Sequence, residues 1–458
     1  MTMEQFAPLM FLGLIIVMLI GFPVAFSLGA LGLYCGFYAI EMGWFPINFL
    51  NNLPLNIFGI LSNELLLAIP FFTLMGSLLE KCGLAEDMLD SMGQLFGPIR
   101  GGLAYAVIFV GALLAATTGV VAASVISMGL ISLPIMLRYG YDRRLASGVI
   151  AASGTLAQII PPSLVLIVMA DQLGRSVGDM YTGAFIPGLV LASLYAGYVF
   201  LVTMVKPSAA PGLPLEAQTL ADADGKARRT SLLVVAIIAG LAGYFAIRET
   251  GTSPGPDFVV LTMSVGVVVA LVIAVINRIS GLNLLSRMAE QTIFVMVPPL
   301  GLIFLVLGTI FIGVATPTEG GAMGAAGAII LALMKRRLSF DLLRQATEST
   351  AKLSAFVLFI LIGARVFSLT FYGVNGHKWV EELLVNLPGG QVGFLIFVNA
   401  LIFVLAFFLD FFELAFIAVP LIGPAADRLG IDLIYKISFL RAVVRKSIGP
   451  CLSYLTRW

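Results

Sequence analysis

The sequence predicts an all-α polytopic membrane protein, and three observations lead to that fold class. Of the 458 residues, 60% are hydrophobic and only 11% are charged, whereas a soluble domain carries about 25% charged residues. Long apolar stretches recur along the whole chain, and at about 20 residues per spanning helix they predict roughly ten or more membrane-embedded segments. Prolines and small polar residues interrupt several of these stretches, which predicts helices that break inside the membrane.

The composition excludes several functional classes. Lysine and arginine total 26 and aspartate and glutamate 25, so no charge bias indicates binding to nucleic acid. Cys35, Cys82 and Cys451 lie far apart and His377 is the only histidine, which argues against a zinc cluster or a redox pair. The chain has no GxxxxGK[ST] loop, no HExxH and no GxSxG near its histidine. We therefore expect neither an enzyme nor a bound cofactor.

A retained membrane span begins the chain and a polar segment divides it. The stretch from Gln5 to Ile40 is uncharged and lacks the basic start of a cleaved signal peptide. The longest polar segment, Lys206 to Arg229, combines proline, alanine and mixed charge, which is typical of a solvated linker. The predicted organisation is a first half at 1–205, a linker at 206–230, a second half at 231–435 and a basic tail at 436–458.

The two halves resemble each other. An offset of 288 aligns "GGLAYAVIFVGAL" with "GGQVGFLIFVNAL", and an offset of 290 aligns "PIMLRYGYD" with "PAADRLGID". Internal duplication with interrupted segments in matching places indicates a secondary transporter whose site lies at the repeat interface.

The first long apolar stretch predicts a re-entrant helical hairpin. Gly101 to Leu137 contains 37 uncharged residues, too many for one spanning helix and too few for two. One tilted helix followed by an apolar loop is the alternative. Thr117, Thr118, Gly119 and Ser124 interrupt this run in "AATTGVVAAS". Hydroxyl and freed carbonyl oxygens at a hairpin tip suit a hard cation, but the same small residues also permit close helix packing.

A broken helix is predicted in "ASGTLAQIIPPSLVLIVMAD", Ala152 to Asp171. Two adjacent prolines remove two backbone donors and clash with the preceding turn, so a continuous helix cannot pass through them. Half-helix ends offer N–H groups to a carboxylate and C=O groups to a cation, although a structural kink without a ligand fits equally well. The candidate binding residues here are Ser153, Gly154, Thr155, Pro161, Pro162 and Ser163.

Three acidic residues and one arginine lie within apolar sequence. In "GVATPTEGGAMG", Glu319 follows Thr316 and Thr318; this acid binds a cation, pairs with a base such as Arg365, or lies at an interface, and a structural or gating role is favoured. Arg365 either holds a carboxylate through its bidentate donors or extends to the membrane surface.

The remaining two acids occur in "FFLDFFELAF", where Asp410 and Glu413 are three residues apart on one helical face. The internal alignment makes this segment the counterpart of the Thr117 region. Two buried acids would neutralise a cation, and a solvated hairpin tip explains them equally well. The basic clusters "RYGYDRR" and "MKRRL" are expected to face the cytoplasm under the positive-inside rule.

Five segments resemble the large membrane subunit of tripartite ATP-independent periplasmic (TRAP) transporters. They are "AIPFFTLMG", "AATTGVVAAS", "GYDRRLASGVIAASGTLAQIIPPS", "TPTEGGAMG" and "FLDFFELAF", in the order of the family. The resemblance implies two inverted repeats with hairpins and broken helices, an elevator-type movement, and Na⁺-coupled import of a small organic anion such as a C4-dicarboxylate. It also implies a small membrane subunit, a periplasmic substrate-binding protein and a multi-pass location in a bacterial or archaeal inner membrane.

The resemblance also assigns places to the candidate residues. Thr117 to Ser124 would form the first hairpin tip, Gly154 to Ser163 the broken helix facing it, and Asp410 to Glu413 the second tip. Na⁺ would be the only metal ion.

The tail departs from the family pattern. TRAP large subunits carry a second Pro-Pro motif, expected here near residue 451, but this chain has "YKISFLRAVVRKSIGPCLSYLTRW" with five basic residues and no acid after Tyr435. The tail therefore predicts a truncated or frameshifted C-terminus. A transport-inactive remnant is the resulting alternative to an active permease, and a channel is a further alternative.

Overall fold

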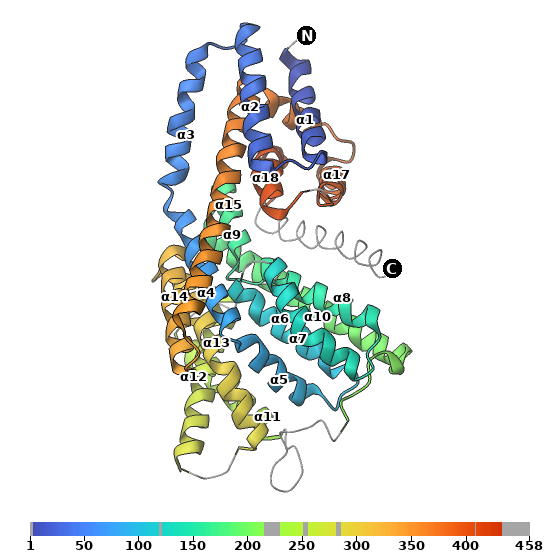
Figure 1. The fold of residues 1–458 in the computed structure, drawn as a ribbon, viewed down its shortest axis with the longest axis vertical. Coiled ribbons are helices and arrows are strands. Elements are labelled where there is room, and N and C mark those ends of the chain that lie inside the picture. Colours follow the sequence, from blue (N-terminus) through green and yellow to red (C-terminus); the bar gives the residue numbers. More distant parts are fainter. Residues whose placement is uncertain are drawn as a thin grey trace. The chain divides into compact units, whose positions relative to one another are not determined.

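The protein is almost entirely helical in a computed structural model, which describes residues 3–118, 121–214, 230–250, 255–280, 285–407 and 409–432 (Figure 1). No β-strand occurs within these ranges. Seven described helices are long and apolar enough to cross a membrane, or up to nine if two bent helix pairs each count as one span. Four shorter apolar helices accompany them. The prediction of an all-α polytopic membrane protein is confirmed.

The described residues divide into two compact units, of which the first contains residues 3–67, 167–177 and 351–432. Its elements are α1 (Met3–Leu19), α2 (Val24–Glu41), η1 (Ile47–Asn51), α3 (Asn52–Leu61), η2 (Glu64–Leu67), most of α9 (Leu164–Leu173), most of α15 (Phe340–Gly373), α16 (Gly376–Val385), α17 (Gly390–Leu405) and α18 (Phe411–Arg428).

Glycines allow α2 and α15 to cross closely in the first unit. A Cβ atom on Gly32 would lie 2.8 Å from both the Cα and the N of Phe367, and a Cβ atom on Gly363 would collide with the carbonyl oxygen of Ala25. Because the two helices lie so close, the Thr370 hydroxyl of α15 donates a hydrogen bond of 2.8 Å to the Gly32 carbonyl of α2. Small residues are the usual means by which membrane helices approach without a hydrophobic driving force.

The second unit contains residues 68–166 and 178–350. Its elements are α4 (Ala68–Lys81), α5 (Leu84–Phe96), α6 (Gly102–Thr118), α7 (Val121–Arg138), α8 (Arg143–Gly154), η3 (Thr155–Gln158), α10 (Val177–Val205), η4 (Pro207–Ala209), α11 (Thr230–Arg248), α12 (Pro256–Ser280), α13 (Arg287–Phe311) and α14 (Pro317–Met334).

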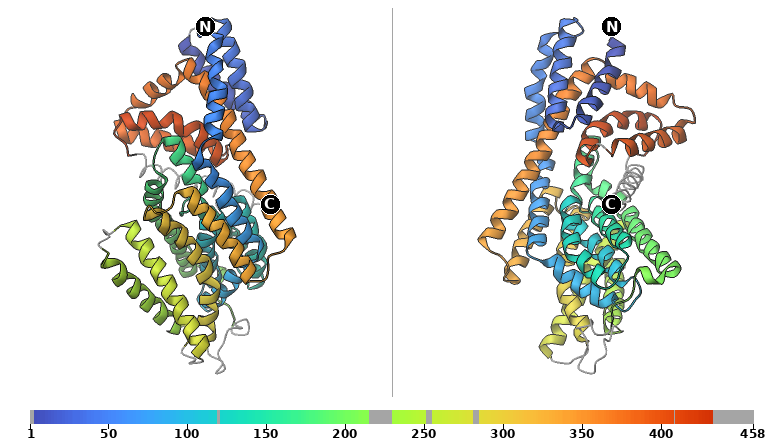
Figure 2. Two further views of the ribbon diagram at one scale, coloured as in Figure 1. Left: turned by 90° about the vertical axis from the view of Figure 1, so that its left-hand side faces the viewer. Right: turned by 45° about the vertical axis from the view of Figure 1, so that its right-hand side comes forward.

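Apolar side chains of α5, α6, α7 and α8 form the main core of the second unit. Helix α4 packs against α14, and α11 lies beside α12 (Figure 2). The Asp87 carboxylate of α5 accepts from Lys335 Nζ at 2.9 Å and from Arg337 Nη2 at 3.1 Å. It therefore links α5 to the residues that follow α14. Arg337 also donates to the carbonyls of Cys82 and Gly83, so a guanidinium satisfies carbonyl groups that the end of α4 leaves open.

The beginning of the polar segment 206–230 is docked on the second unit. Gly101 N donates to Ala210 O and Asp142 N to Ala209 O, both at 2.9 Å, and both alanines are buried. Ala209 and Ala210 are therefore packed against this unit, whereas Lys206, Pro207 and Ser208 before them are exposed. Residues 215–229 lie outside the described part of the chain, as does the tail 436–458. The division into two sequential halves and their inverted duplication stay predictions.

Candidate functional site

Two helices with a short break form the predicted first hairpin. Helix α6 ends at Thr118, α7 begins at Val121, and the two helices contact each other. The alternative of one tilted helix followed by a loop does not describe this segment. Thr117 and Thr118 belong to the last turn of α6, and Ser124 is buried in the first turns of α7. The side chains of both threonines, and all of Gly119, lie outside the described part.

The predicted broken helix is also present. Helix α8 ends at Gly154, η3 continues to Gln158, and α9 begins only at Leu164, after the two prolines. Gly154, Pro161 and Pro162 are buried. The helix breaks at the paired prolines, which remove two backbone donors, although α13 (Arg287–Phe311) continues through the adjacent Pro298 and Pro299.

Three buried hydroxyl groups flank the break. Ser153 donates to Val149 O at 2.6 Å, Thr155 to Ala152 O at 2.7 Å, and Ser163 to Gln158 O at 2.8 Å. Each hydroxyl carries one proton and two lone pairs. With the proton directed at a local carbonyl, the lone pairs stay available to accept a hydrogen bond or to coordinate a cation.

The hairpin packs directly on the broken helix. Helices α6 and α7 both contact α8 and η3. A Cβ atom on Gly111 of α6 would lie 2.7 Å from Ser153 Cβ, and one on Gly154 would lie 3.1 Å from both the Cα and the N of Val125 in α7. Glycine on one side of each contact is what lets these backbones approach. The structure thus brings the start of α7 against the end of α8, the juxtaposition that the resemblance implied.

Glu319 belongs to a capping box at the start of α14. Thr316 N donates to Glu319 Oε2 at 2.8 Å, and Glu319 N donates to Thr316 Oγ1 at 3.3 Å. Both residues are exposed, Thr318 is half-buried, and Pro317 begins the helix. These reciprocal bonds satisfy two amide donors that a helix N-terminus leaves open. The signature Thr-x-x-Glu is present in the sequence, from which we predicted a structural or gating role for this acid without assigning it to a helix N-terminus.

Glu413 performs a related task at the start of α18. Asp410 N donates to Glu413 Oε2 at 2.8 Å, and the two residues form a second capping box. Glu413 is buried and Asp410 is exposed. Helices α17 and α18 contact each other, so this N-terminus belongs to a second pair of packed helices. A cation role for either acid stays a prediction.

Arg365 is exposed on α15. No carboxylate in the described part of the chain forms an ion pair with it. A polar contact that no sequence pattern indicated lies elsewhere in the same unit: Asn63 Nδ2 donates to Asp171 Oδ1 at 2.5 Å, and Gln172 Nε2 donates to Asp171 Oδ2 at 2.8 Å. The 108 residues between Asn63 and Asp171 explain why the sequence did not reveal it.

The capping geometry predicts that the charge of Glu319 is dispensable. Gln retains an oxygen that accepts from Thr316 N, so we expect the Glu319→Gln variant to be about as stable as the native chain. Glu319→Ala removes the acceptor and is expected to lower the stability measurably. SDS titration of the purified variants compares the three stabilities. A Gln variant as unstable as the Ala variant would show that the charge itself is required.

Comparison with known proteins places the chain in a family. The model of "Tripartite ATP-independent periplasmic transporter, DctM component" matches residues 11–447, and so continues past Tyr435 into the tail for which the sequence predicted a truncation or frameshift. The C4-dicarboxylate TRAP transporter large permease protein DctM of Rhodobacter capsulatus is 27% identical over 439 residues, covering 96% of this chain and 85% of that protein.

Two other relatives are named for different substrates. The isethionate TRAP transporter permease protein DctMQ of Oleidesulfovibrio alaskensis is 22% identical over 93% of this chain and 56% of that protein. The sialic acid TRAP transporter permease protein SiaT of Haemophilus influenzae is also 22% identical, over 92% of this chain and 56% of that protein. With a family match over nearly its whole length, the chain belongs to the DctM component family, the large membrane permease subunits of TRAP transporters.

Proposed function

We propose that this chain is the permease subunit of a Na⁺-coupled importer for a small organic anion. The observation that carries the proposal is the packing of the α6–α7 hairpin on the α8–η3 break, with buried hydroxyls along the break. C4-dicarboxylates, isethionate and sialic acid, for which the relatives are named, are all anions at neutral pH. A C4-dicarboxylate or another carboxylate is the substrate class that we infer.

The helix ends at the break supply complementary partial charges. The C-terminus of α8 carries a partial negative charge, and the N-terminus of α7 carries the opposite partial charge. Val125 lies against Gly154, so these two ends are close in space. Na⁺ prefers oxygen ligands, and carbonyl and hydroxyl oxygens at the break suit it. An anion bound near the start of α7 would then sit beside the coupling cation.

Membership of the family supports two partners. We infer that a small membrane subunit and a periplasmic substrate-binding protein work with this chain in a bacterial or archaeal inner membrane. This chain matches 56% of the length of the relative named DctMQ.

Uptake into liposomes tests the proposal. The chain is reconstituted with its small subunit, and radiolabelled C4-dicarboxylate is presented with its binding protein. We expect uptake only when Na⁺ is higher outside, and none when K⁺ replaces Na⁺ or when the binding protein is omitted. Uptake unchanged in K⁺ would overturn the coupling, and single-channel currents without substrate would identify a channel instead.

A further inference from the structure

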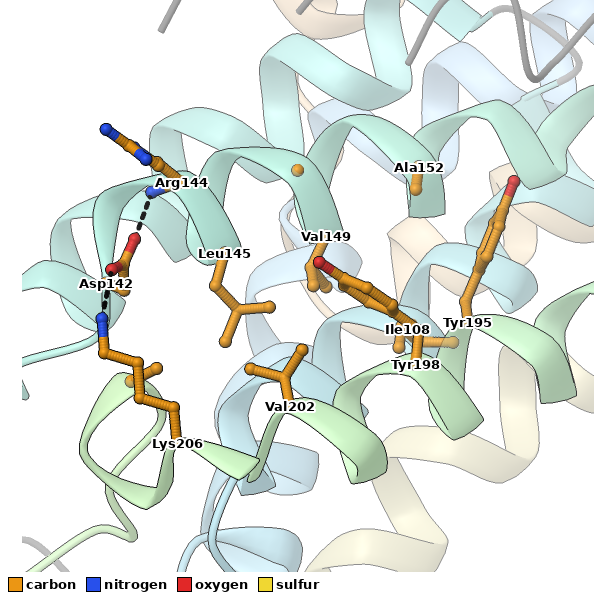
Figure 3. Close-up of a pocket in the computed structure, with 12 residues that line it drawn as sticks. Ile108, Asp142, Arg144, Leu145, Val149, Ala152, Tyr195, Tyr198, Val202 and Lys206 are labelled. Atoms are coloured by element: carbon orange, nitrogen blue, oxygen red, sulfur yellow. Dashed lines mark hydrogen bonds and ion pairs between the residues drawn. The ribbon is translucent and has the colours of Figure 1, made fainter. Parts of the chain in front are cut away.

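A cleft of about 530 Å³ lies between α8 and the C-terminal half of α10 (Figure 3). Both helices belong to the second unit. Asp142, Arg144 and Lys206 line one end of the cleft, and apolar or aromatic side chains such as Leu145, Val149 and Val202 line the rest. The cleft therefore has a charged end and an apolar channel.

The charged end has two basic side chains and one acidic side chain, and neither basic side chain is held in a strong ion pair. Lys206 Nζ lies 3.8 Å from Asp142 Oδ2, with 66% of the lysine side chain exposed, and an exposed pair of this kind contributes little. Arg144 is exposed, and none of the described carboxylates pairs with its guanidinium; only its backbone N–H donates to Asp142. An anion can therefore bind both cations without breaking a strong ion pair.

The position and length of the cleft match one leaflet of a bilayer. The apolar span of α10 ends at Val205, directly before Lys206, which places the charged end at the membrane surface. From Lys206 to Tyr195 the helix rises about 16 Å at 1.5 Å per residue, and half of a hydrocarbon core is roughly 15 Å. Gly148, which also lines the cleft, is exposed, so the channel is open toward the surrounding lipid.

Two phenols extend from α10 toward α8 across the channel (Figure 3). They belong to Tyr195 and Tyr198, and neither hydroxyl forms a hydrogen bond with another described residue. The two aromatic rings add apolar surface to the channel at the depth where an acyl chain would lie.

We propose that this cleft binds an anionic glycerophospholipid, with its phosphate on Arg144 and Lys206 and one acyl chain between α8 and α10. A soluble phosphate would use the charged end alone and leave the apolar channel without a role. Anionic lipids are enriched at the cytoplasmic leaflet, the side on which the basic cluster around Arg144 is expected.

Native mass spectrometry of the full chain in detergent, with phosphatidylglycerol added, tests the charged end. Each basic residue near the surface strengthens anionic lipid binding by about fivefold, so Arg144→Gln with Lys206→Gln is expected to weaken binding roughly thirtyfold. Arg336→Gln with Lys352→Gln is the matched control, because both residues are exposed and unpaired among the described residues. Equal loss in both double variants, or equal binding of phosphatidylcholine by the native chain, would overturn the proposal.

A second pair of variants tests the channel. A Cβ atom on Gly148 would meet nothing within 4 Å, so Gly148→Leu should fold normally and fill the channel. Gly197→Leu on α10 is the control, since its Cβ also meets nothing within 4 Å and it lies outside the cleft lining. We expect phosphatidylglycerol binding to fall at least tenfold in Gly148→Leu and to persist in Gly197→Leu. Binding unaffected by Gly148→Leu, or displacement of the lipid by millimolar inorganic phosphate, would identify a surface anion site instead.

Discussion

Gly154→Ala is expected to destabilise the chain by about 1–3 kcal/mol, the cost of forcing extra atoms into a packed contact, and to reduce Na⁺-driven uptake strongly. The added Cβ would lie 3.1 Å from the Cα and the N of Val125 and would collide with its Cγ2. Backbone atoms of a helix cannot yield locally, so α7 must move away from α8. Titration with SDS measures the loss of stability, and the liposome assay measures uptake.

Gly148→Ala provides a control of opposite sign on the same helix. Its Cβ would meet no atom within 4 Å, and alanine favours a helix over glycine by up to about 1 kcal/mol. We therefore expect Gly148→Ala to be as stable as the native chain or more stable. Equal stability of the two variants would show that the contact with Val125 does not constrain the hairpin.

Gly32→Ala is expected to cause a comparable loss at the crossing of α2 and α15. The new Cβ would lie 2.8 Å from the Cα and the N of Phe367, which implies about 1–3 kcal/mol of overpacking. Separation of the helices would also lengthen the hydrogen bond from Thr370 to Gly32, worth about 1 kcal/mol. SDS titration measures the sum.

A local measurement separates this effect from general unfolding. Cys35, three residues after Gly32 on the same helix, is a buried free thiol, and its labelling by a maleimide, located by mass spectrometry, reports on the crossing. We expect faster labelling in Gly32→Ala and native rates in Gly29→Ala, because a Cβ on Gly29 meets nothing within 4 Å. Native labelling rates in both variants would contradict the close crossing.

The local features of the candidate site were predictable because their causes are local. Pro161 and Pro162 disfavour a continuous helix, and α8 ends before them, although α13 continues through the adjacent Pro298 and Pro299. The uncharged run from Gly101 to Leu137 is longer than one membrane crossing, and it forms two helices. Glu319 shows the opposite case, since its local signal, Thr-x-x-Glu, was available but its role at a helix N-terminus was not recognised.

Contacts between distant segments were not predictable. Nothing in the sequence around Gly111 indicates Ser153 as its neighbour, and nothing around Asn63 indicates Asp171. Ala209 and Ala210 belong to a segment predicted as a polar linker, yet both are buried. Their carbonyls accept hydrogen bonds from the amides of Asp142 and Gly101, which lie in two separate turns. Such pairs depend on which helices pack together, and apolar helices can pack in many arrangements that bury nearly equal apolar area.

The sequence by itself determined that this protein is a helical membrane protein with interrupted helices and a TRAP-type order of motifs. Those properties follow from composition and from the need of every membrane-embedded backbone group for a hydrogen-bond partner. Only the tertiary structure decided that α7 meets the end of α8 at Gly154, and that a charged cleft opens between α8 and α10. In a membrane, burial of apolar area does not select among helix pairs, so close backbone approach at glycines and a few polar contacts make the choice.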